Sequence, residues 1–206
     1  MDCGEFQIRN KEYYKSFSKV NFFKKLLDNK NQKFSDIIIF DVGAHKGESA
    51  KFFSEVFQKP KIYCFEPNPE AIKEIEKNNI QNTKIFPIAL SDYEGNSTFN
   101  IQNISHLSSL VKVNRNSEDS LGYATNETHN EINIKVKKGD NVILDEGVNH
   151  IDILKIDVQS NETKTLMGFE HSLSIINYII VEISFYDFYE NKSSIKEIEM
   201  VLKDFP

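Results

Sequence analysis

Apolar and polar residues follow two alternating patterns along most of this chain of 206 residues. Short apolar runs rich in β-branched residues predict strands at 36–42, 61–66, 83–90, 151–157 and 178–184. Apolar residues at helical spacing predict helices between and after them, at 47–57, 69–79, 161–169 and 193–205. Buried strands that alternate with amphipathic helices are typical of a parallel sheet covered on both faces. We therefore expect an α/β fold with three layers.

Other segments depart from this alternation. Residues 95–102 and 131–137 alternate polar and apolar positions and predict two further strands, with a polar loop insertion at about 103–130 between them. A loop of that length in a compact domain is usually functional or disordered. Residues 1–34 are rich in Lys and Asn, and their apolar positions predict a helical appendage to a domain at 35–206. Because an α/β domain normally adds a strand after its last helix, we expect one or two C-terminal strands to lie beyond this sequence.

Charge and composition argue against several classes of partner. The net charge is −6, and no block of five or more basic residues is present, which disfavours nucleic acid and anionic membrane surfaces. No apolar run approaches the ~20 residues that span a bilayer, and the first residues lack the apolar core of a signal peptide. Cys3 and Cys64 form no metal-type cluster and suit a reducing compartment. We expect a cytoplasmic protein without a membrane span.

A glycine-containing turn ends the first predicted strand. It is formed by Asp41-Val42-Gly43-Ala44-His45-Lys46-Gly47 and leads into a helix that starts near Gly47 and includes Glu48, a further candidate for ligand binding. Two glycines four residues apart let the backbone turn tightly and approach a ligand closely, and the N–H groups of a helix N-terminus suit a carboxylate. The turn lacks the GxGxxG spacing of dinucleotide-binding proteins and the GK[ST] of a P-loop. It predicts a ligand loop, and its plainer interpretation is an ordinary strand-to-helix turn.

The tips of the next two strands carry residues that fit a nucleoside. They are Glu66, Pro67 and Asn68 at the second tip and Ala89, Leu90 and Ser91 at the third. An acidic residue such as Glu66 can accept hydrogen bonds from both ribose hydroxyls, and Leu90 can pack on an adenine ring whose amino edge can hydrogen-bond to Ser91 or Asp92. Plainer interpretations are a solvated strand end, a helix cap or the start of a turn. Because adjacent strand tips lie side by side, the features together predict a nucleoside site.

Several segments together resemble the FkbM family of methyltransferases. They are DVGAHKGES at 41–49, CFEPNPEA at 64–71, IALSDYEGNSTF at 88–99, DILKIDVQSNE at 152–162, LMGFE at 166–170 and IIVEIS at 179–184. The resemblance implies a Rossmann-like class I methyltransferase sheet, S-adenosylmethionine (SAM) as methyl donor held by these strand tips and by Asp157, and often a sugar or other hydroxyl as acceptor. The family usually carries an acidic residue and a glycine after Ile-Asp-Val, where this chain has Gln159 and Ser160.

Methyl transfer to a hydroxyl is an in-line displacement, which requires alignment of the reactants and exclusion of water. A base or a metal ion that lowers the pKa of the hydroxyl assists it. Asp157 and Glu182 lie at the ends of the fourth and fifth strands, where one of them can hold the ammonium group of SAM, act as base, or bind a divalent cation with help from Glu162. His106, in the long loop, is a further candidate base. Plainer roles are a turn cap for Asp157, a pair with a lysine for Glu182 and a solvated side chain for His106.

Three further residues are candidates for acceptor binding. Ser108 and Ser109 belong to a Ser-Ser-Leu segment that the resembling family often carries near the acceptor, and Tyr186 follows the fifth strand, where it can stack on a sugar or cover the core. Oligomeric state does not follow from the sequence. We expect a SAM-dependent O-methyltransferase that acts on a sugar, a glycan or a small-molecule hydroxyl. Two alternatives stay open: a degenerate, non-catalytic SAM-binding or interaction module, and a nicotinamide-dependent oxidoreductase, which the missing GxGxxG disfavours.

Overall fold

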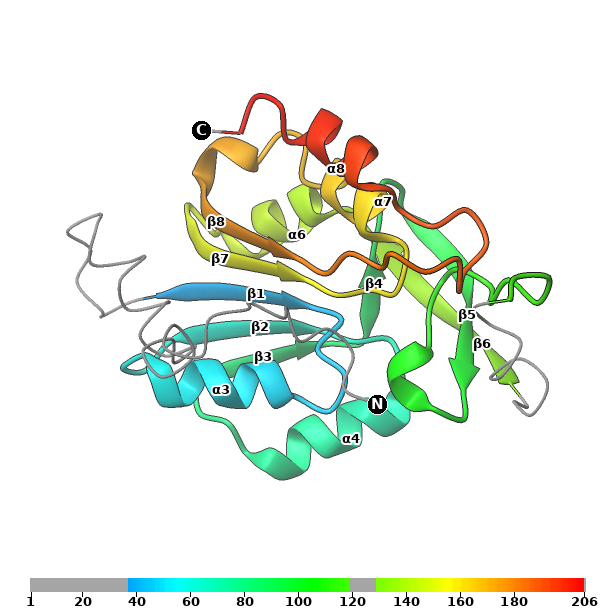
Figure 1. Ribbon diagram of the computed structural model, residues 1–206. Coiled ribbons are helices and arrows are strands. Elements are labelled where there is room, and N and C mark those ends of the chain that lie inside the picture. The colour runs from blue at the N-terminus through cyan, green and yellow to red at the C-terminus, as the bar shows by residue number, and fades with distance from the viewer. Residues whose placement is uncertain (1–36, 119–128, 206) are drawn as a thin grey trace, which may run out of the picture.

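The computed structural model describes residues 37–118 and 129–205 of the chain. Its main sheet has five strands in the order β3-β2-β1-β7-β8, and every neighbouring pair is parallel (Figure 1). The strands are β1 (Ile38–Val42), β2 (Lys61–Phe65), β3 (Thr83–Phe86), β7 (Ile151–Ile156) and β8 (Ile176–Val181). Each of the five predicted apolar runs therefore contributes a strand to this sheet.

Helices cover both faces of the main sheet. They are α3 (Glu48–Val56), α4 (Pro69–Asn78), α6 (Gly139–Glu146), α7 (Glu162–Met167) and α8 (Ile195–Val201). Side chains of α6, α7 and α8 pack on the face that carries Phe40 and Leu154, and side chains of α3 and α4 pack on the face that carries Ile39 and Ile62. Successive residues of β1 thus enter different cores, because side chains alternate across a strand. The predicted α/β fold with three layers is confirmed.

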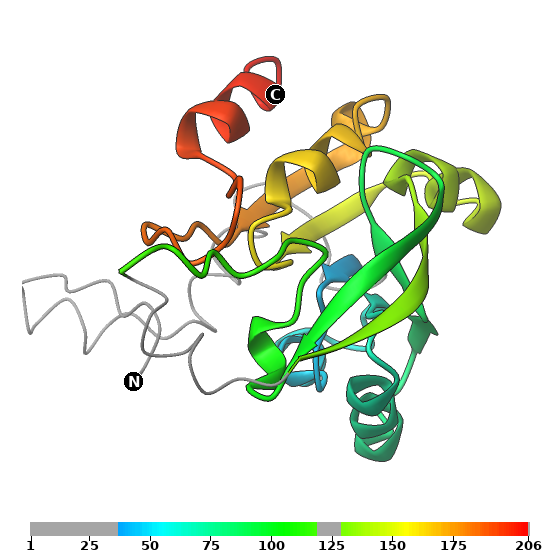
Figure 2. The same cartoon turned by 90° about the vertical axis from the view of Figure 1, so that its right-hand side faces the viewer.

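A smaller sheet of three strands lies next to the carboxyl ends of the main sheet and faces the viewer in Figure 2. Its order is β4-β6-β5, with β4 (Ile88–Leu90), β5 (Gly95–Gln102) and β6 (His129–Lys137). The single strand predicted at 83–90 is therefore wrong, because the chain passes from β3 to β4 through Pro87 and the two strands lie in different sheets. Proline has no N–H to donate to a strand ladder, which explains why pairing is interrupted there.

One helix escaped prediction from the hydrophobic pattern. In α6 the large apolar residues Val142 and Ile143 are buried, whereas Leu144 is 77% exposed. Two buried apolar positions give too little periodicity for a helix to be recognised. The helix ends at Gly147, which adopts a left-handed φ of 62°.

The loop expected at 103–130 contains more structure than its polar composition indicated. A 3₁₀ turn, η1 (Ser105–Leu107), follows β5, and an isolated β-bridge joins Val113 to Tyr189. Residues 119–128 of this loop and the helical appendage expected at 1–34 lie outside the described residues.

The strand order reverses between β1 and β7, because β2 and β3 extend the sheet on one side of β1 and β7 lies on the other. In open α/β sheets, ligands bind outside the carboxyl ends of the strands at such a switch point. The small sheet and η1 lie at the same end (Figure 1). In the described part of the chain, no helix has the length and apolar character needed to cross a membrane.

Candidate active site

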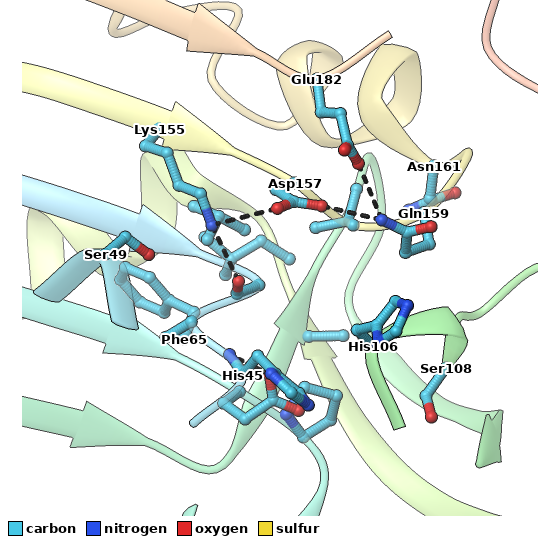
Figure 3. Close-up of a pocket in the computed structure, with 18 of the residues that line it drawn as sticks. His45, Ser49, Phe65, His106, Ser108, Lys155, Asp157, Gln159, Asn161 and Glu182 are labelled. Atoms are coloured by element: carbon cyan, nitrogen blue, oxygen red, sulfur yellow. Dashed lines mark hydrogen bonds and ion pairs between the residues drawn. The ribbon is translucent and has the colours of Figure 1, made fainter. Parts of the chain in front are cut away.

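A cavity of about 730 Å³ opens at the switch point between β1 and β7 (Figure 3). Its lining comes from the carboxyl ends of β1, β2, β7 and β8, from the small sheet and from η1. The volume falls in the range of ~300–1,000 Å³ that small-molecule sites occupy. Most of the residues predicted for a cofactor and an acceptor therefore meet around one cavity.

The turn after β1 depends on Gly43. Its φ of 75° lies in the left-handed region, and its N–H donates to the carbonyl of Phe65 over 3.0 Å. A Cβ at this position would lie 1.8 Å from the carbonyl oxygen of Asp157. Glycine is therefore required for the close approach of β1 to the end of β7. Of the residues predicted in this turn, those that line the cavity are Val42, Gly43, Ala44, His45 and Glu48.

Asp41 and Gly47 belong to the same turn but do not line the cavity. The fully buried carboxylate of Asp41 accepts a hydrogen bond from Ser49 Oγ (2.9 Å) and pairs with Lys155 Nζ (3.0 Å). Gly47, at a φ of 84°, precedes α3, and its N–H donates to the carbonyl of Ala44. Both residues therefore shape the turn from outside the cavity lining.

Glu66 presents a buried carboxylate, 5% exposed, at the tip of β2. Its Oε2 accepts the N–H of His45 (2.8 Å) and its Oε1 accepts the N–H of Asn68 (2.9 Å). Burial raises the pKa of Glu66 to about 7, although the two N–H groups act in the opposite direction. Each oxygen keeps a lone pair for a further donor such as a hydroxyl. Pro67 also lines the cavity, whereas the side chain of Asn68 caps α4 by accepting the N–H of Glu70.

The residues predicted at the tip of β4 differ in whether they face the cavity. Ala89 and Leu90 line the cavity, and Ser91 does not. Ser91 is fully buried, and its Oγ donates to Asp92 Oδ1 (3.1 Å) and accepts from Asn161 Nδ2 (3.3 Å). Ser91 thus connects the small sheet to the segment before α7.

Lys155, on β7, pairs with the carboxylates of Asp41 and Asp157. Its Nζ lies 3.0 Å from Asp41 Oδ1 and 3.6 Å from Asp157 Oδ2, and it donates to the carbonyl of Gly43 over 2.9 Å. Burial by itself lowers the pKa of Lys155, but the two carboxylates outweigh it and raise that pKa above its usual value. Lys155 therefore stays charged and connects β1 to the end of β7.

Asp157 and Glu182, which follow β7 and β8, are neighbouring carboxyl groups that shift the pKa of one another. Burial and the neighbouring Asp157 raise the pKa of Glu182 to about 8. For Asp157, burial acts upward, but Lys155 and the hydrogen bonds outweigh it, so its pKa is lowered. The two carboxyl groups therefore shift in opposite directions: the pKa of Glu182 rises and that of Asp157 falls.

Gln159 lies between these two carboxyl groups (Figure 3). Its Nε2 donates to Asp157 Oδ1 (2.9 Å) and to Glu182 Oε2 (2.7 Å), and its Oε1 accepts from the hydroxyl of Tyr189 (3.1 Å). Sequence reasoning noted Gln159 only as a departure from the FkbM pattern, and it grouped Tyr189 with the aromatic residues after the fifth strand that can stack on a sugar or cover the core. No local spacing connects Gln159 to Tyr189, which is 30 residues away along the chain.

The residues predicted for the acceptor fall into two groups. His106 and Ser108 line the cavity. Ser109 is fully buried and donates through Oγ to the carbonyl of Gln159, and Tyr186 is 68% exposed and does not line the cavity. Ser109 therefore stabilises the backbone of the turn at Gln159 and does not face the cavity.

His45 connects the turn after β1 to η1. Its Nε2 lies 2.8 Å from Ser105 Oγ and its Nδ1 lies 3.5 Å from Glu48 Oε2, while its ring meets that of His106 edge to face at 6.4 Å between centroids. Burial lowers the pKa of His45, although Glu48 acts in the opposite direction. His45 is therefore a neutral wall of the cavity at neutral pH.

Among the residues that the structure describes, no group of three or more His, Cys, Asp or Glu side chains is placed to hold a metal ion. Glu162, the third ligand considered for a cation, accepts the N–H groups of Ser160 (3.0 Å) and Val158 (3.3 Å) through Oε1. Its carboxylate therefore holds the turn between β7 and α7.

A family model of the FkbM methyltransferase domain matches residues 41–205, which include most of both sheets and the whole cavity lining. The chain belongs to the FkbM family of methyltransferases. This result confirms the family and the enzyme class predicted from the sequence, and it disfavours a nicotinamide-dependent oxidoreductase. FkbM membership implies SAM as the methyl donor.

Relatives of this FkbM protein are similar to it at low identity. The 2-O-methyltransferase NoeI of Sinorhizobium fredii is 25% identical, over 82% of this chain and 72% of NoeI. The hexuronic acid methyltransferase AglP of Haloferax volcanii is 26% identical, over 72% of this chain and 56% of AglP. The methyltransferase sdnD of Sordaria araneosa is 25% identical, over 82% of this chain and 73% of sdnD. All three names specify methyltransferases, in agreement with the family assignment.

Proposed function

We propose that this FkbM-family protein transfers a methyl group from SAM to a hydroxyl group of a sugar. The observation that carries the proposal is a single cavity with the buried, backbone-bonded carboxylate of Glu66 at one end and the carboxyl groups of Asp157 and Glu182, bridged by Gln159, at the other. We call the first end the donor end; it is formed by Gly43, Ala44, Glu66, Ala89 and Leu90. The second is the acceptor end; it is formed by His106, Asp157, Gln159 and Glu182.

The donor end fits SAM by the chemistry of its groups. Glu66 is held by two backbone N–H groups and keeps oxygen lone pairs for the two ribose hydroxyls. Ala89 and Leu90 offer an apolar wall for the adenine ring. The turn at Gly43 leads into the N-terminus of α3, whose N–H groups suit the carboxylate of the methionine moiety.

When bound, SAM supplies a methyl group on a positively charged sulfur, which leaves as an uncharged thioether. The acceptor oxygen loses its proton as it forms the new bond to carbon. Because the oxygen gives electron density to that bond, its remaining proton becomes strongly acidic. A carboxylate of low pKa therefore suffices to take the proton. We assign this role to Asp157, which Lys155 keeps ionised, and name His106 as the second candidate base on the facing wall.

A sugar hydroxyl is the acceptor that the site and the relatives support best. Ser105, Ser108 and Asn161 line the cavity with hydroxyl and amide groups, and Phe99 adds an aromatic side chain. Few polar groups set in an apolar lining are typical of sites that orient a small ligand. AglP is named for a hexuronic acid and NoeI for a 2-O position, which supports the same acceptor class.

Calorimetric titration with S-adenosylhomocysteine (SAH), followed by a transfer assay, tests the proposal. We expect SAH to bind and labelled methyl groups to pass from SAM to members of a panel of neutral and acidic sugars. Asp157→Asn should lower the transfer rate about 100-fold or more while the protein still binds SAH. No binding at SAH concentrations on the order of millimolar would refute the donor end. Binding without transfer to any sugar would instead support the non-catalytic alternative.

A further inference from the structure

Gln159 belongs to the acceptor end, but neither the family match nor the proposed function gives its side chain a role. We propose that Gln159 is a positioning residue that holds Asp157 and Glu182 side by side at the acceptor end, and that Tyr189 supports its amide from the opposite end. The inference rests on the proposed function for its catalytic consequence. Its structural content, the titration of two carboxyl groups, does not depend on activity.

The side-chain amide of Gln159 uses both of its N–H groups on this pair. One points to Asp157 Oδ1 at 2.9 Å and the other to Glu182 Oε2 at 2.7 Å. Two carboxyl groups in contact repel when both are ionised, and a donor to both offsets that repulsion. Gln159 thus brings together side chains from the ends of two different strands and supplies the hydrogen bonds that let them remain there.

Tyr189 contacts the end of the Gln159 amide that faces away from the carboxyl groups. Its hydroxyl lies 3.1 Å from Gln159 Oε1 and 2.8 Å from the carbonyl of Leu107, and both of these oxygens are acceptors. The hydroxyl has one hydrogen, so it donates to one of these two oxygens at a time. The two carboxyl groups fix the direction of the amide, because the reversed amide would place its oxygen against them. Tyr189 is 4% exposed, so it has little freedom to move away.

The backbone of Gln159 is also held in an unusual conformation. Its φ of 55° lies in the left-handed region, which costs free energy for a residue with a Cβ. The Oγ of the fully buried Ser109 donates to the Gln159 carbonyl, and the next N–H, of Ser160, donates to Glu162. Such conformations persist where the surrounding structure over-determines them, and they cluster at functional sites.

Other charges face the pair and remain in place when Gln159 is changed. Lys155 and Asp41 lie on the β7 and β1 side, and Glu162 acts on Glu182 from α7. A third carboxylate at position 159 would remove both donors and add a like charge to this group. The pair would then release its remaining proton at higher pH, and the ionised base would be less well aligned with the acceptor.

Carbon-13 NMR of labelled side-chain carboxyl groups in the full chain tests the inference without an activity assay. The signal of Glu182 is assigned from its loss in Glu182→Gln. We expect Gln159→Glu to move the ionisation of Glu182 upward by about one pH unit or more, as a neighbouring like charge does. Tyr189→Phe should shift it in the same direction by less. Gln81→Glu, which adds the same charge at an exposed position far along the chain, should leave it unchanged.

Kinetics then separate positioning from a merely structural role. In Gln159→Glu we expect the transfer rate at saturating substrate to fall about tenfold or more, the pH profile of that rate to shift upward, and the Kd for SAH to stay within twofold of wild type. An unchanged Glu182 titration in both Gln159→Glu and Tyr189→Phe would overturn the inference. Absence of transfer by the wild-type protein would instead contradict the proposed function, with the NMR result still deciding the role of Gln159.

Discussion

The two ends of the cavity are built in different ways. At the donor end, Glu66 is fixed by backbone N–H groups of His45 and Asn68, and the turn is fixed by the glycine at position 43. At the acceptor end, side chains bind one another, with Gln159 joining Asp157, Glu182 and Tyr189. Because the donor end is held by backbone groups, we expect most side-chain substitutions there to leave its geometry intact and substitution of Gly43 to disrupt it. Because the acceptor end is held by side chains, we expect substitution of any one of them to change its geometry.

The largest expected effect is that of Gly43→Ala at the donor end. The added Cβ would lie 1.8 Å from the Asp157 carbonyl oxygen, and the alanine would have to adopt the positive φ of 75°. We therefore expect the free energy of unfolding to fall by about 3 kcal/mol or more and SAH binding to be lost. Gly147→Ala is the matched control, because it has a φ of 62° and no atom within 4 Å of the new Cβ. Urea denaturation should show about 1 kcal/mol for that control. Equal losses of stability in the two variants would contradict the conclusion that the donor end depends on Gly43.

Next in size is the effect of Glu66→Ala on the affinity for SAH. Loss of the charged acceptor for the ribose should weaken binding by about 1–3 kcal/mol, or roughly 5- to 150-fold, measured by calorimetry. Glu70→Ala removes an exposed carboxylate from the neighbouring helix and should leave the affinity unchanged. If both variants bind SAH like the wild-type protein, the nucleoside does not contact Glu66.

The raised pKa of Glu66 predicts a pH dependence at the donor end that the acceptor end should not share. A ribose hydroxyl donates to the ionised carboxylate, and the pKa of Glu66 is raised by burial to about 7. Affinity for SAH should therefore increase by up to about tenfold per pH unit as pH rises toward 7, and then level off. Glu66→Gln should flatten that profile, and Asp157→Asn should not. A flat wild-type profile would count against this assignment.

The stability of the ligand-free protein should change with pH in the opposite direction. Because the folded state raises the pKa of Glu66 from 4.5 to about 7, the folded form prefers the protonated group. This contribution is present in full below 4.5 and is lost as pH rises through about 7. Glu182, whose pKa is raised to about 8, likewise lowers stability as pH rises toward that value. The decline of the thermal midpoint between pH 5 and 8 should be smaller in Glu66→Gln than in wild type; an unchanged decline would contradict it.

The donor end could be predicted from sequence because its contacts are close in the chain or follow from strand order. Gly43 ends a recognisable strand, and Glu66 ends the next one, two adjacent positions in a parallel sheet. At the acceptor end, Asp157, Glu182 and His106 could be predicted, whereas the role of Gln159 could not. Gln159 and Tyr189 meet through tertiary packing, which no spacing encodes.

Other differences between expectation and structure have a similar physical origin. Ser91 and Ser109 carry the side chains expected of ligand contacts, but both are fully buried and satisfy groups inside the fold. Only burial distinguishes an internal hydroxyl from one that faces a cavity. Pro87, by contrast, was a readable signal for the break between β3 and β4, because a residue without an N–H interrupts a strand ladder.

The smallest expected effect concerns Ser160, at the acceptor end. Its φ is 77°, and its buried Oγ has no hydrogen-bond partner among the described residues. Ser160→Gly relieves the backbone and removes the unpaired hydroxyl, so we expect urea denaturation to show a gain of about 1 kcal/mol. Lys59→Gly, at an exposed site with a φ of 54°, relieves the backbone alone and should gain less.

The stability and the activity of Ser160→Gly together decide what that conformation is for. If the variant is more stable and transfers methyl groups at the wild-type rate, the serine is a tolerated departure from the glycine usual in the FkbM family. If it is more stable but slower, the rigidity of the turn contributes to the alignment of Gln159, since the adjacent residue shares the same left-handed backbone. No gain over Lys59→Gly would show that the buried hydroxyl is satisfied, and the strain at the acceptor end would then lie in Gln159 alone.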